Sequence, residues 1–130
     1  MDEVLFSVHR WLGYALTVVV LVAAMVAFGR AKNGQEFTAG LYRAVYGVLS
    51  LHVLLGIALY TTRQAWDMDA LIAYVHPALG IVALGLGQAL LGRARRTQMA
   101  ADAHRLAGRA LLLTLVLILG AVGVASVPGA

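Results

Sequence analysis

The sequence predicts an all-α integral membrane protein, an antiparallel four-helix bundle that runs up-down-up-down. Hydrophobic residues make up 62% of the 130 residues and charged residues only 12%, whereas a soluble domain usually has about 25% charged residues. The apolar residues form four blocks, each close to the ~20 residues that cross a bilayer as a helix. The connecting segments are short, which favours antiparallel neighbours. We therefore expect a single membrane domain over residues 1–130.

The predicted transmembrane helices cover residues 5–28, 42–62, 71–91 and 99–127. The first follows acidic residues, and its apolar run is too long for a signal-peptide core, so we expect it to be retained. The second follows a polar connector, Gly29 to Gly40. The third contains Pro77, which we expect to start or kink this helix. The fourth begins near Met99 or, if only its strongly apolar part is counted, at His104.

Basic residues predict the orientation of the bundle. The first and third connectors, with their flanks, hold Arg30, Lys32, Arg43, Arg93, Arg95, Arg96, Arg105 and Arg109, whereas the opposite side holds only Arg10 and Arg63. The positive-inside rule then places both termini on the non-cytoplasmic side of the plasma membrane. The net charge of +4 is explained by topology and contact with anionic lipid, and not by nucleic acid. The absence of cysteine excludes disulfides, thiolate zinc sites, iron–sulfur clusters and covalently attached haem.

Each predicted helix contains one histidine, followed four residues later by a glycine. The four pairs are His9 with Gly13, His52 with Gly56, His76 with Gly80, and His104 with Gly108. Residues i and i+4 share a helix face, so each imidazole is expected beside bare backbone on which a porphyrin could lie flat. Ionisable groups inside a membrane are expensive and tend to be functional. We predict that the four histidines ligate b-type haem, one or two per chain. Zinc or copper would normally add a carboxylate or sulfur ligand, and the predicted helix interiors have none.

Depth in the membrane predicts how the histidines pair. His9 and His76 both lie roughly 6–8 Å from the outer side, on helices that are diagonal in a square bundle, so we expect them to share one haem. By elimination, His52 and His104 would hold a second haem nearer the cytoplasm. With straight helices this pair differs in height by roughly 15 Å, unless the fourth helix begins near Met99.

Three arginines lie close to these histidines in the sequence: Arg10, Arg105 and Arg109. We predict that they bind haem propionates, with snorkelling to the membrane interface as the simpler alternative.

The third and fourth helices resemble the cytochrome b561 family in the runs HPALGIVALGLGQALLG and HRLAGRALLLTLVLILG, which begin at His76 and His104. The resemblance implies two b haems on opposite sides of the membrane, with His9 paired to His76 and His52 to His104. It also implies electron transfer across the membrane from a donor such as ascorbate, quinol or another redox protein.

The favoured hypothesis is an electron-transfer protein or oxidoreductase subunit that carries electrons within or across the membrane and has no catalytic side chain. Two alternatives stay open. One is a haem-modifying or haem-handling enzyme like the four-helix haem A synthases, although those would have a catalytic glutamate near a histidine. The other is a structural protein or haem-bearing anchor subunit of a larger complex. The expected partners are haem, the lipid bilayer and a quinol or redox protein, and the assemblies considered are a larger complex and a homodimer.

Overall fold

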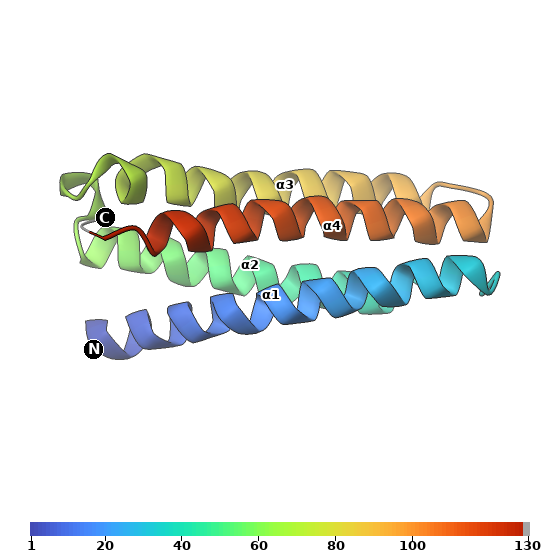
Figure 1. Ribbon diagram of the computed structural model, residues 1–130, viewed down its shortest axis with the longest axis horizontal. Coiled ribbons are helices and arrows are strands. Elements are labelled where there is room, and N and C mark those ends of the chain that lie inside the picture. Colours follow the sequence, from blue (N-terminus) through green and yellow to red (C-terminus); the bar gives the residue numbers. More distant parts are fainter. Residues whose placement is uncertain (129–130) are drawn as a thin grey trace.

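The computed structural model describes residues 1–128, which form a bundle of four long helices (Figure 1). They are α1 (Asp2–Lys32), α2 (Gly40–Thr62), α3 (His76–Arg95) and α4 (Ala100–Ala125). Each is long and apolar enough to cross a membrane when α3 is counted with the turn that precedes it. The prediction of an all-helical chain with four helices that are long and apolar enough to span a membrane is confirmed.

α1 is longer than the predicted span of residues 5–28, because the charged residues at both of its ends are also helical. Asp2 and Glu3 lie in its first turn, and Arg30 and Lys32 lie in its last turn. Acidic groups are favourable near a helix N-terminus and basic groups near its C-terminus, because they complement the helix dipole. The polar flanks thus continue the helix beyond its apolar block. At the other end of the chain, α4 begins at Ala100, which agrees with the longer of the two predicted starts.

The α2–α3 connector contains two short turns. A 3₁₀ turn, η1, spans Ala65–Asp67, and a π-helical turn, η2, spans Leu71–Val75 and leads directly into α3. Pro77 lies in the first turn of α3. It has no N–H to donate to the preceding turn, and the wider π turn occurs where this regular bond is missing. His76 therefore sits at the junction between η2 and α3.

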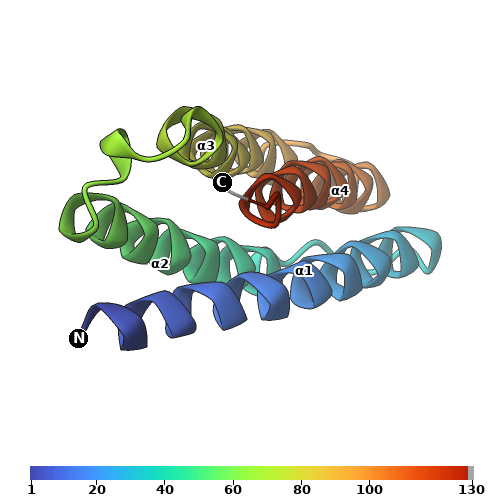
Figure 2. The ribbon, with the colours of Figure 1, turned by 60° about the vertical axis from the view of Figure 1, so that its left-hand side comes forward.

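In the bundle, α1 packs mainly on α2 and α4, and α3 likewise packs on α2 and α4. Figure 2 shows α3 and α4 side by side, with α1 and α2 beneath them. α1 and α3 are thus diagonal, and the start of α1 and the end of α4 lie at the same end of the bundle in Figure 1. We call this the terminal end. The opposite end, where α2 and α4 begin, is called the basic end.

The core combines large and very small side chains. Tyr42, Tyr46 and Leu111 are completely buried, and alanines line much of the interior face of α1. Small residues let transmembrane helices approach closely. The same effect appears where Tyr46 of α2 packs directly against Gly87 of α3.

Candidate histidine site

Three of the four histidines gather toward the terminal end, one each from α1, α2 and α3. The imidazoles of His9 and His52 are stacked, with ring centroids 4.1 Å apart and planes inclined by 5°. The ring of His76 meets that of His9 edge-on, with centroids 6.1 Å apart and planes inclined by 72°. The predicted neighbours His9 and His76 are therefore close across the diagonal, and His52 joins them.

The glycines of α1 and α2 make room for these imidazoles. A Cβ on Gly13 would lie 3.3 Å from Cε1 of His52, and a Cβ on Gly56 would lie 3.0 Å from Cε1 of His9. Each glycine thus accepts the histidine of the neighbouring helix, which makes the two His-x-x-x-Gly motifs a reciprocal packing device. The sequence interpretation had placed a porphyrin against these two glycines, and in this structure an imidazole lies there instead.

His76 is oriented by a backbone carbonyl. Its Nδ1 donates a hydrogen bond of 2.9 Å to the carbonyl oxygen of Ala121 in α4. A carbonyl can only accept, so Nδ1 carries a proton, and in the neutral imidazole the lone pair is on Nε2. Histidine ligands of metals commonly have this second interaction, which sets the tautomer and the ring orientation. One turn later, a Cβ on Gly80 would meet nothing within 4 Å, so the space on that face of α3 is open.

The stacked pair has unsatisfied hydrogen-bonding capacity. Nδ1 of His9 and Nδ1 of His52 are both buried, and neither has a hydrogen-bond partner among residues 1–128. A buried polar atom without a partner costs about 1–3 kcal/mol, so such atoms call for an explanation such as a ligand or ion. In the described part of the chain, no group of three or more His, Cys, Asp or Glu side chains is arranged to hold a metal ion.

His104 lies apart from this cluster and is fully buried near the basic end. Its Nδ1 is 2.7 Å from the hydroxyl of Tyr42, and its Nε2 is 3.1 Å from the carbonyl oxygen of Glu36. Because the carbonyl must accept from Nε2–H, the tyrosine hydroxyl donates to Nδ1. Both ring nitrogens are thus occupied, and the aromatic ring of Phe37 packs at 5.0 Å.

The structure does not bring His52 and His104 together, and their joint ligation of a haem stays a prediction. His104 contacts Tyr42, and His52 is ten residues further along α2, which corresponds to about 15 Å of helix. An early start of α4 was expected to close this gap. α4 does begin at Ala100, but its first turns pack beside the start of α2. The height difference persists because α4 runs parallel to α2 from the same end of the bundle and reaches the level of His52 only several turns later.

The remaining residues proposed to contact haem have other neighbours. A Cβ on Gly108 would lie 2.9 Å from the ring of Phe28, so this glycine accommodates an aromatic side chain. Arg105 forms an exposed ion pair of 2.9 Å with Asp102, and Arg109 is exposed. Both of these arginines lie near His104 and far along the bundle from the histidine cluster.

Arg10 is also exposed, although it is next to His9 in the sequence. Its guanidinium lies 5.7 Å from the ring centroid of Phe6 and 5.8 Å from that of Trp11, both on the same helix. Such cation–π contacts at a helix surface agree with snorkelling along apolar side chains. The predicted contact of these arginines with haem propionates stays a prediction.

Two buried polar partners were not identified from the sequence. Tyr42 binds His104, and Tyr46 forms a 2.9 Å hydrogen bond with Thr114. The i, i+4 spacing of the two tyrosines on α2 places them on one face, a signal that could have indicated their role. The carbonyl of Ala121 has no side-chain signature, so its contact with His76 could be found only from the folded chain.

No family model, curated protein or solved structure matches this chain, so the comparisons neither support nor contradict the resemblance to the cytochrome b561 family.

Proposed function

We propose that this protein is a membrane cytochrome that holds one b-type haem toward the terminal end of the bundle and carries electrons there. The observation that supports this best is the placement of His9 and His76 on diagonal helices, with ring centroids 6.1 Å apart. His9 and His76 would hold the haem together, one imidazole from each of the two diagonal helices.

The local environment of each histidine supports this assignment. His76 has its Nε2 lone pair free, since Nδ1 is bonded to the carbonyl of Ala121. His9 is half-buried with its buried Nδ1 unpaired, and stacking on His52 restrains the orientation of its ring. The open space beside Gly80 lies on the face of α3 that also presents His76. His52 is thereby a positioning residue for His9.

When bound, haem supplies one-electron transfer between ferric and ferrous iron. His9 and His76 would hold the haem through their imidazoles, and a haem held by two histidines would favour electron transfer over chemistry on a bound small molecule. A second haem receives no support, because both nitrogens of His104 already have partners. We further propose that the protein lies in the plasma membrane with both termini outside, on the strength of its basic residues, and that a quinol or redox protein is its donor.

Visible spectroscopy with haem extraction tests the proposal on full-length protein purified in detergent after expression with adequate haem. We expect one haem per chain and a sharp α-band on reduction. His76→Ala and His9→Ala should each abolish that band, whereas His104→Ala, the matched control, should retain the haem. Far-UV circular dichroism verifies that each variant is folded.

Three results would overturn the proposal. Folded, colourless wild-type protein would exclude a haem cytochrome altogether. Two haems per chain would contradict the single site. Loss of haem in His104→Ala, with retention in His76→Ala, would show that the wrong histidines have been assigned.

A further inference from the structure

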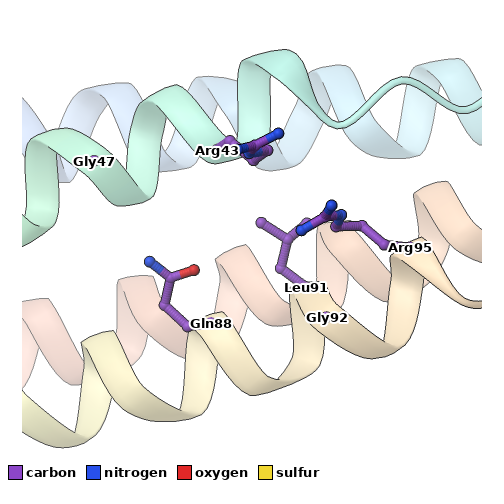
Figure 3. Close-up of a pocket in the computed structure, with 6 residues that line it drawn as sticks. All are labelled: Arg43, Gly47, Gln88, Leu91, Gly92 and Arg95. Atoms are coloured by element: carbon purple, nitrogen blue, oxygen red, sulfur yellow. The ribbon is translucent and has the colours of Figure 1, made fainter.

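A cavity at the basic end lies outside the histidine site and opens between α2 and α3. Its volume is about 300 Å³, and it is lined by Arg43, Gly47, Gln88, Leu91, Gly92 and Arg95. Figure 3 shows Gln88 and Arg95 extending from α3 toward α2, with Arg43 on the opposite helix. We call it the arginine pocket.

Two glycines keep the arginine pocket open. A Cβ on Gly47 would meet nothing within 4 Å, and a Cβ on Gly92 would meet only the guanidinium of Arg96, at 3.8 Å. The space between the helices at this level is therefore not filled by core side chains. A ligand could enter without displacing the packing of the bundle.

The pocket carries positive charge without a counter-charge. The ion pairs formed within residues 1–128 are Arg63 with Glu3 and Arg105 with Asp102, and no acidic residue lines the pocket. Its two arginines repel each other across a common space, and an anion between them would relieve that repulsion. Guanidinium groups bind phosphate with two parallel N–H donors each, which makes phosphate a well-matched anion.

The shape of the pocket favours an amphiphile over a free anion. Gln88 is seven residues before Arg95, about 10 Å further along α3, and Leu91 lies between them. The lining therefore changes from charged at the mouth to apolar and amide-bearing toward the middle of the span. An amide facing hydrocarbon is costly unless it is hydrogen-bonded, and ester oxygens of a phospholipid could accept from Gln88 at this depth.

We propose that the arginine pocket binds one anionic phospholipid, with its phosphate between Arg43 and Arg95 and its ester region beside Gln88. Basic pockets between transmembrane helices are known to bind anionic head groups in this way. The proposal is independent of the histidine site, since no histidine lines the arginine pocket.

Native mass spectrometry of the full-length protein in neutral detergent tests this inference by titration with phosphatidylglycerol or phosphatidylcholine. We expect phosphatidylglycerol to bind at least about tenfold more tightly, the effect of roughly one charge-assisted hydrogen bond. Arg43→Gln/Arg95→Gln should abolish the preference. The matched control, Lys32→Gln/Arg93→Gln, removes the same charge from exposed positions at the same end and should preserve it.

A further variant and a competition experiment distinguish a bound phospholipid from a free anion. Gln88→Leu leaves the charges intact and should weaken phosphatidylglycerol binding several-fold, while millimolar inorganic phosphate should not displace the lipid. Equal binding of the two lipids, or equal losses in the test and control pairs, would overturn the proposal. Displacement by inorganic phosphate would overturn the phospholipid assignment in favour of a free anion. Unchanged helical content and oligomeric state verify that the variants are folded.

Discussion

Substituting Gly87 by alanine should destabilise the bundle, because this position touches a fixed aromatic ring. A Cβ there would lie 2.6 Å from the hydroxyl oxygen of Tyr46 and 2.7 Å from Cζ, well inside van der Waals contact. Tyr46 is fully buried, and its hydroxyl is hydrogen-bonded to Thr114 at 2.9 Å. The ring cannot move aside without breaking that bond or pushing α2 away from α3.

The size of the effect follows from three contributions. Overpacking a core typically costs about 1–3 kcal/mol, and loss of the hydrogen bond between Tyr46 and Thr114 adds about 0.5–1.5 kcal/mol. Alanine in place of glycine favours the helix by up to about 1 kcal/mol. We therefore expect Gly87→Ala to lower the free energy of unfolding by roughly 0.5–4.5 kcal/mol.

Reversible unfolding in mixed micelles, followed by circular dichroism, measures this difference. Gly85→Ala is the control, because residue 85 is exposed on the same helix and a Cβ there would meet nothing within 4 Å. The control should be neutral or up to about 1 kcal/mol more stable. If the two variants had equal stability, the contact between Gly87 and Tyr46, and with it the rotational setting of α3 against α2, would be wrong.

Three further changes have defined outcomes in the same unfolding assay. Gly108→Ala should lose about 1–3 kcal/mol through overlap with the ring of Phe28, and Phe28→Leu in the same chain should recover most of it; no recovery would exclude that overlap. Tyr42→Phe should cost about 1–3 kcal/mol, because it leaves Nδ1 of His104 buried without a donor, and haem content should not change; a loss of haem would contradict a single site at the terminal end. Arg63→Gln should change the free energy of unfolding by less than about 1 kcal/mol, since the Glu3 carboxylate with which Arg63 pairs is 90% exposed. A larger loss would show that this ion pair is better shielded than its exposure indicates.

The helices themselves could be predicted from the sequence because hydropathy and length are local properties. Four apolar blocks predicted the four spans, and charged residues at the ends of α1 continue that helix for reasons that are visible in the chain. The approach of His9 to His76 also follows from simple rules, since short connectors set the order of helices around the bundle and the rise per residue sets their heights.

The partners of His52 and His104 depended on the tertiary structure. Height and order do not specify how far each helix is rotated about its own axis, and this rotation is decided by packing between side chains, such as that of Tyr46 on Gly87. In the folded chain, the rotation of α2 about its axis turns His52 toward His9 and lets Tyr42 reach His104. A histidine and a glycine four residues apart define a face, and only the neighbouring helix determines what occupies it.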